Sequence, residues 1–196
     1  ASPRKSAGSN VLLADLLSSA ENGGMTDMTI VSKEGEAVRA SSFVLGARSP
    51  ILQKALYPEG GGRPRNLRLP DYSTYVVSSL ISYCCSNEIE PCATYNEASS
   101  RELASLAACA WDFQTEGLDS LVCEAASSII ESYPTLACAM FDEACTRDDD
   151  VAPRLRKLTL ESIRRHPEAS LIKRNAFLNL ELGVSYLAPR ALELIL

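Results

Sequence analysis

The chain has 196 residues, of which 46% are hydrophobic and 22% charged, so it can bury one large core or two small ones. Its net charge of −6 argues against nucleic-acid binding, which usually requires a basic face. No window reaches the roughly 18 consecutive apolar residues of a membrane span, so we expect no membrane segment.

The N-terminus and the cysteines indicate an intracellular protein. Residues 1–9 are expected to be a disordered lead-in rather than a signal peptide, because no apolar segment follows the basic residues Arg4 and Lys5. The seven cysteines are an odd number, and most lie in apolar periodic segments, where free Cys behaves as a small hydrophobic residue. This usage favours a reducing compartment, so we expect a cytoplasmic and/or nuclear location.

The first ninety residues are predicted to combine a small sheet with short helices. In chain order, the pattern predicts a helix over 11–19, strands over 25–32 and 37–40 around a turn at 33–36, a helix ending at Arg48, a helix starting at Pro50, a loop over 58–66, a strand over 67–69 and a helix over 72–85. Ser49 is expected to cap the second helix of the close pair, with Pro50 at its first position. Asp71 or Ser73 is expected to cap the helix over 72–85.

After Pro91 the pattern becomes almost entirely helical. Helices are predicted around 103–110, 118–129, 136–144, 151–165 and 177–187. An acidic run at 146–150 is expected to cap the helix over 151–165, and His166 to end it. Short helices joined by tight breaks predict antiparallel helical hairpins.

Candidate catalytic and metal-ligating residues are few. His166 is the single histidine, and a charge favourable to a helix C-terminus explains it best. Cys84 and Cys85 are adjacent rather than spaced as C-x-x-C, and the glycines at 60–62 lack the Lys and Ser/Thr of a phosphate loop. The acidic run Asp148–Asp150 lacks the spacing of a calcium loop. We therefore predict no catalytic residue, no metal site and no cofactor, and expect that the protein is not an enzyme.

Five separated segments of the first half together resemble a BTB/POZ domain. They are "LLADLL" (12–17), "TDMTI" (26–30), "VRASSFVLGARSPIL" (38–52), "LRLPDYS" (67–73) and "YCCSNEIE" (83–90). The third resembles the family pattern A-H-R-x-V-L-A-A-R-S-P. The resemblance implies an α+β fold over 10–93, a small β-sheet flanked by short helices. Residues 94–196 look like BTB C-terminal helices followed by an all-α BACK-like helical-hairpin region, because "AFLNLELGVSYL" (176–187) is similar to the BACK signature.

This resemblance implies a non-catalytic protein-interaction module. BTB domains commonly homodimerise, and those with a BACK region often bridge cullin-3 to a substrate held by another domain. The implied dimer-interface residues are Leu12, Leu13, Leu16, Leu17, Asp27, Phe43, Val44 and Ala47. The implied cullin-interface residues are Leu52, Leu56, Tyr57, Glu59, Tyr83 and Asn87. The first hypothesis is a substrate adaptor of a cullin-3 RING E3 ubiquitin ligase; the alternative is a BTB oligomerisation scaffold of a cytoplasmic or nuclear complex without a ubiquitin-ligase role.

Two departures from the family pattern bear on these partners. Ser41 and Ser42 stand where the family usually has His-Arg, so the Arg that usually lies near the central Asp is missing and homodimerisation stays open. Tyr57-Pro58-Glu59 has the apolar-x-Glu form of many cullin-binding members, but it comes early and precedes a glycine run. Leu56 and Tyr57 are expected to be exposed at the start of this loop.

Purely structural roles are the alternatives for these residues. The leucines over 12–17 are about as well explained by packing within their own domain as by a dimer interface. For Phe43 and Leu45, a place in the core is favoured over a contact with a partner. Arg48 is expected to donate to loop carbonyls, and Asp27 is equally consistent with a cap at the start of a strand. These alternatives depend on burial, which a structure reports directly.

Overall fold

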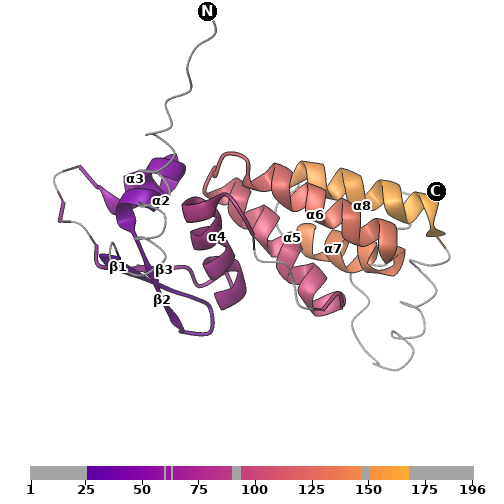
Figure 1. Ribbon diagram of the computed structural model, residues 1–196, viewed down its shortest axis with the longest axis horizontal. Helices are drawn as coiled ribbons and strands as arrows, with labels where there is room; N and C mark the ends of the chain where they lie inside the picture. Colours follow the sequence, from indigo (N-terminus) through magenta and orange to yellow (C-terminus); the bar gives the residue numbers. More distant parts are fainter. Residues whose placement is uncertain (1–25, 60, 63, 90–93, 147–150, 168–196) are drawn as a thin grey trace, which may run out of the picture. The chain divides into compact units, whose positions relative to one another are not determined.

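The computed structural model describes residues 26–59, 61–62, 64–89, 94–146 and 151–167 (Figure 1). These residues form two compact units. The first comprises the described residues between 26 and 89 together with 113–116, and the second comprises 94–112, 117–146 and 151–167. The predicted lead-in at 1–9 and the predicted helices over 11–19 and 177–187 lie outside the described residues.

A three-stranded sheet forms one side of the first unit. Strands β1 (Met28–Val31), β2 (Ala37–Ala40) and β3 (Asn66–Arg68) are arranged in the order β2-β1-β3. The central strand β1 runs antiparallel to β2 and parallel to β3, so that Ile30 pairs with Val38 on one side and Leu67 on the other. The predicted hairpin is confirmed, and Gly35 in its turn has φ +83°, a left-handed conformation that glycine adopts without a Cβ penalty.

The predicted pair of short helices is also confirmed. Helix α2 (Ser42–Arg48) ends at Ser49, and α3 (Pro50–Leu56) begins with the next residue. The Ser49 hydroxyl accepts a hydrogen bond from the backbone N–H of Leu52 at 3.0 Å, and Pro50 fills the first helical position, where no donor is needed. Ser49 and Pro50, the residues at the junction of α2 and α3, therefore themselves stabilise the start of α3.

Helix α4 (Thr74–Ser86) is capped from two parts of the chain. Ser73, rather than Asp71, accepts a hydrogen bond from the first turn. The Glu34 carboxylate in the hairpin turn accepts from the backbone N–H of Thr74 at 2.8 Å and from its hydroxyl at 3.0 Å. Hydrogen bonds from its own backbone N–H and from that of Thr74 lower the pKa of Glu34. The hairpin and α4 are thus joined by charge-assisted hydrogen bonds, while α4 buries Val76, Val77, Leu80 and Cys84.

The described residues of the second unit form helices and the turns between them. It contains α5 (Glu97–Asp112), α6 (Leu118–Ser132), a 3₁₀ turn η1 (Pro134–Leu136), α7 (Ala137–Ala144) and α8 (Pro153–Arg165). Helix α5 packs against α6 and α7, and α8 packs against the same two helices. The buried face of α5 contains alanines 104, 107, 108 and 110, whose small side chains let neighbouring helices approach closely.

The ends of α8 agree only partly with prediction. His166 follows the last helical residue, as predicted. Ala152 occupies the position before the helix and makes no side-chain capping bond, while the predicted acidic caps Asp148–Asp150 lie outside the described residues. Among the helices described, none has the length and apolar composition needed to cross a membrane.

Candidate protein-interaction surface

Helix α2 presents an apolar side chain to solvent. Phe43 is 68% exposed, Ala47 is exposed four residues later on the same helical face, and Val44 is half-buried. Leu45 points inward and is 1% exposed, so its alternative assignment to the core is confirmed, whereas that of Phe43 is wrong. Asp27 is also exposed. The other four residues predicted for a dimer interface, Leu12, Leu13, Leu16 and Leu17, lie outside the described residues.

Asp27 caps α2 from the start of the sheet. Its Oδ1 accepts a hydrogen bond from the backbone N–H of Ser42 at 2.8 Å, and its Oδ2 accepts one from the Ser42 hydroxyl, also at 2.8 Å. Ser41, at the N-cap position, makes no side-chain capping bond. Because the helix N-terminus carries partial positive charge, the Asp27 carboxylate stabilises α2 both by hydrogen bonding and by charge. Asp27 is therefore more than a cap at the start of a strand.

Tyr57 extends this polar contact to the end of α3. Its hydroxyl lies 3.3 Å from Ser42 Oγ. Since Ser42 donates its single hydroxyl proton to Asp27, the Tyr57 hydroxyl is the donor to Ser42. A Cβ at Gly46 would lie 3.1 Å from Tyr57 Cε2, so the absence of a side chain at Gly46 lets the ring approach α2. Asp27, Ser42 and Tyr57 thus form a continuous chain, which we call the α2 polar chain.

The residues predicted to face a cullin divide into buried and exposed groups. Leu52 and Leu56 are 0% exposed and Tyr83 is 5% exposed, contrary to the expectation that such residues lie at the surface. The apolar face of α3 turns inward against the unit, because Leu52 and Leu56 are four residues apart on one helical face. Tyr57 is 42% exposed, and Glu59 and Asn87 are exposed. Of these six residues, only the exposed group can contact a partner. The buried group belongs to the core of the first unit.

Arg48 lies at the end of α2 and contacts α4. Its guanidinium donates to the side-chain oxygen of Asn87 and lies 5.2 Å from the centre of the Tyr83 ring. The structural role predicted for Arg48 is present, but its partner is a side-chain amide at the end of α4 rather than a loop carbonyl. Burial raises the pKa of the neighbouring Cys84 thiol to about 12, although the Arg48 charge opposes the shift. Cys84 therefore stays protonated and is not a nucleophile.

Residues 113–116 return to the first unit and complete it. The carbonyl of Phe113 accepts from the Ser49 hydroxyl, and the carbonyl of Glu116 accepts from the Tyr83 hydroxyl at 2.7 Å. The Phe113 ring lies 5.9 Å from the Tyr72 ring, measured between centroids. This segment lies outside the predicted range 10–93, and nothing in its own sequence signals these contacts.

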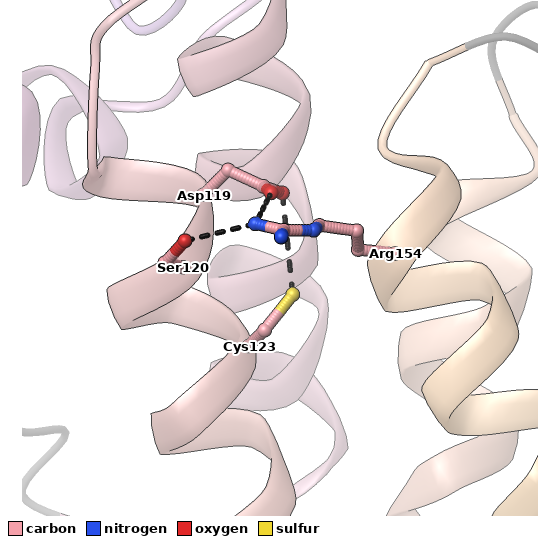
Figure 2. A network of polar contacts seen from close by, with 4 residues as sticks. All are labelled: Asp119, Ser120, Cys123 and Arg154. Carbon is pink, nitrogen blue, oxygen red and sulfur yellow. Dashed lines mark hydrogen bonds and ion pairs between the residues drawn. The ribbon is translucent and has the colours of Figure 1, made fainter.

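The second unit contains a polar network at the start of α6 (Figure 2). Arg154 of α8 donates to Ser120 Oγ at 2.9 Å and to Asp119 Oδ2 at 3.4 Å, while Cys123 Sγ lies 4.0 Å from Asp119 Oδ1. Burial, followed by the Asp119 charge, raises the pKa of Cys123 to about 11. The exposed Arg154 pair contributes less than about 1 kcal/mol, so this network orients two helices and offers no reactive thiol. Within the described ranges, no group of three or more His, Cys, Asp or Glu side chains is placed to hold a metal ion.

Comparison with known proteins gives a family match over more than half of the chain. The model of the BTB/POZ domain matches residues 16–129. Among solved structures, the BTB domain of human Gigaxonin is 22% identical, covers 63% of this chain and 95% of its own, and has a TM-score of 0.46. The BTB domain of zebrafish PATZ1 is 18% identical, covers 65% of this chain and 98% of its own, and has a TM-score of 0.47. No curated protein matches the chain significantly.

Proposed function

Because the chain belongs to the BTB/POZ family, whose domains mediate protein interactions and self-association, we propose that it is a substrate adaptor of a cullin-3 RING E3 ubiquitin ligase in the cytoplasm or nucleus. The observation that carries this proposal is the exposed start of the loop after α3. Tyr57 and Glu59 both face solvent there, and they form the apolar-x-Glu sequence expected of cullin-binding members. The α2 polar chain and Gly46 hold the Tyr57 ring in place, so the loop begins from a fixed position.

We further propose that residues 94–196 include a BACK-like region that sets the distance between the cullin and a recognition domain for the substrate. Support comes from α7 and α8, which follow the residues that the BTB/POZ model matches and pack against each other. The segment that resembles the BACK signature, 176–187, lies outside the described residues.

Binding of the purified N-terminal region of cullin-3 to the folded chain tests the adaptor proposal. We expect binding in the micromolar range or tighter, and an affinity at least about tenfold lower for Glu59→Lys, because the substitution reverses a charge at the contact. Glu36→Lys is the matched control, since Glu36 is an exposed carboxylate of the same unit in the hairpin turn. No binding by a folded sample at micromolar concentration, or equal losses for the two variants, would refute the proposal.

Self-association as an oligomerisation scaffold is the second candidate function. The 68% exposure of Phe43 on α2 favours it, since covering a phenyl ring contributes roughly 1.5–3 kcal/mol. We expect light scattering to give a dimer at tens of micromolar and a monomer for Phe43→Asp. Gln53→Asp, at an exposed position of α3, is expected to remain dimeric. A monomeric natural chain would exclude this candidate and leave the cullin measurement to decide the first.

A further inference from the structure

Two tyrosines of the second unit form an exposed aromatic pair. Tyr95 precedes α5 and is 49% exposed, and Tyr133 follows α6 and is 48% exposed. Their ring centroids are 5.9 Å apart and their planes are inclined by 37°. Neither side chain makes a hydrogen bond to another described residue. The pair therefore presents two adjacent, half-exposed rings to solvent, and the faces of such rings carry partial negative charge.

The electrostatic surroundings of the pair favour a cation. Tyr133 occupies the C-cap of α6, where the helix carbonyls carry partial negative charge, and the last turn of α6 contains no basic residue. Glu131, two residues before Tyr133, is exposed. No Lys or Arg occurs in 94–100 or 124–137, and the next base, Arg101, lies 3.9 Å from the carboxylate of Glu143. The last turn of α6 and the residues that follow it up to 137 thus contain none of the basic side chains that commonly complement such an end.

The positive charge at the start of α5 is already complemented within the chain, so this helix end does not attract an anion to the same surface. Asn96 Oδ1 accepts from the backbone N–H of Ser99 at 2.9 Å, and Ser99 Oγ accepts from the backbone N–H of Asn96 at 3.0 Å. This reciprocal capping satisfies donors at the helix start, and Glu97 in the first turn complements the remaining positive charge.

We propose that Tyr95 and Tyr133, at the C-terminal end of α6, form a binding site for an arginine side chain from a basic segment of a partner protein. A guanidinium group is planar and weakly hydrated, so it stacks on an aromatic face while donating hydrogen bonds to helix carbonyls. A lysine ammonium is a compact, strongly hydrated charge and fits the two rings less well. We call this surface the tyrosine-pair site; it does not depend on cullin binding.

Fluorescence polarisation with the full 196-residue chain tests the site. The probes are three labelled peptides of Gly and Ser that carry four Arg, four Lys or four Gln residues at the same positions. We expect the Arg peptide to bind most tightly, the Gln peptide not to bind, and added salt to weaken binding. Tyr95→Ala and Tyr133→Ala should each weaken the Arg peptide about two- to five-fold, while Tyr133→Phe, which keeps the ring, should retain binding.

Matched controls separate this site from general attraction of a basic peptide to an acidic protein. Trp111→Ala removes another exposed aromatic ring of the same unit, near the far end of α5, and Glu124→Gln removes another exposed carboxylate of α6. Both controls should bind the Arg peptide as the natural chain does. Equal binding of the Arg and Gln peptides, no binding at millimolar peptide, or equal losses for the tyrosine and control variants would overturn the proposal. A dimer that Tyr133→Ala converts to a monomer, with no effect of the Arg peptide, would also overturn it by making the surface a contact between two copies.

Discussion

Replacing Asp27 with Ala removes the acceptor of both hydrogen bonds at the start of α2. Ser42 is 0% exposed, so its backbone N–H and its hydroxyl lose a charged acceptor in a place where water reaches them poorly. Loss of a helix cap costs about 1 kcal/mol, and loss of a hydrogen bond to a charged group costs about 1.5–3 kcal/mol. We therefore expect Asp27→Ala to destabilise α2 by about 2–4 kcal/mol.

The second substitution in the same pair gives the sharper test. Ser42→Ala alone should cost about 1–2 kcal/mol, because it removes one charge-assisted hydrogen bond. In the Asp27→Ala background the same change removes a hydroxyl that has already lost its charged acceptor. The Tyr57 hydroxyl that donated to it belongs to a partly exposed side chain and can donate to water instead, so the change should be nearly neutral. The two substitutions should thus be non-additive by about 1–2 kcal/mol.

Amide hydrogen exchange followed by mass spectrometry measures this locally, which matters because the two units need not unfold together. A loss of 2 kcal/mol should speed exchange of the amides over 42–48 about thirty-fold, while the amides of α8 serve as an internal reference. Glu36→Ala, which removes an exposed carboxylate of the same unit, should leave α2 exchange unchanged. Unchanged α2 exchange in Asp27→Ala, or additive effects in the double variant, would refute the reasoning.

Three further outcomes are expected in urea unfolding followed by circular dichroism. Leu56→Asp should unfold the first unit, because a carboxylate replaces a fully buried side chain at a cost of at least about 4 kcal/mol. Gln114→Gly should stabilise the chain by about 0.5–1 kcal/mol, since Gln114 is exposed and has φ 49°, where glycine carries no Cβ penalty. Raising the pH from 9 to 11 should narrow the stability difference between the natural chain and Cys84→Ala, by up to about 1.4 kcal/mol per pH unit. The Cys84 pKa of about 12 keeps the folded thiol protonated while the unfolded thiol ionises, so the folded state binds more protons and loses stability as pH rises.

Gln53, an exposed residue of α3, supplies controls for two of these variants. Gln53→Asp should leave the first unit folded, and Gln53→Gly should destabilise it by about 1 kcal/mol because glycine weakens a helix interior. A folded Leu56→Asp variant would mean that Leu56 is exposed after all. A destabilised Gln114→Gly variant would contradict the argument from the φ of Gln114. If the stability difference between the natural chain and Cys84→Ala stays constant with pH, the argument from the Cys84 pKa is wrong.

Local patterns predicted most elements of the first unit because their causes lie within a few residues. The alternation of Met28 and Ile30 predicted a strand, and Ser49-Pro50 predicted the break between two helices, since capping and periodicity act over one turn. The cap that Asp27 provides for α2 was not predicted, because it joins residues fifteen positions apart. Neither were the contacts of residues 113–116, which depend on how the chain returns to α3 and α4.

The interaction surface was harder to predict because periodicity identifies the apolar face of a helix only when the helix is long. Helices α2 and α3 have seven residues each, and from their sequence alone a core position was favoured for Phe43 and an exposed position for Leu56. A usable signal was nevertheless present in the comparison with the family pattern. Ser42 replaces the usual Arg and Gly46 replaces an Ala, and the Tyr57 side chain lies against both positions.

The return of residues 113–116 to the first unit has a consequence for synthesis of the protein on the ribosome. All strands of the sheet and helices α2, α3 and α4 emerge before the carbonyls of Phe113 and Glu116, which accept from Ser49 and Tyr83. The N-terminal unit therefore cannot complete its hydrogen bonds until α5 has also been translated, although domains generally fold in the order in which they emerge. Until then the nascent chain exposes the side of the first unit that residues 113–116 later cover. During this interval a chaperone would bind that exposed surface.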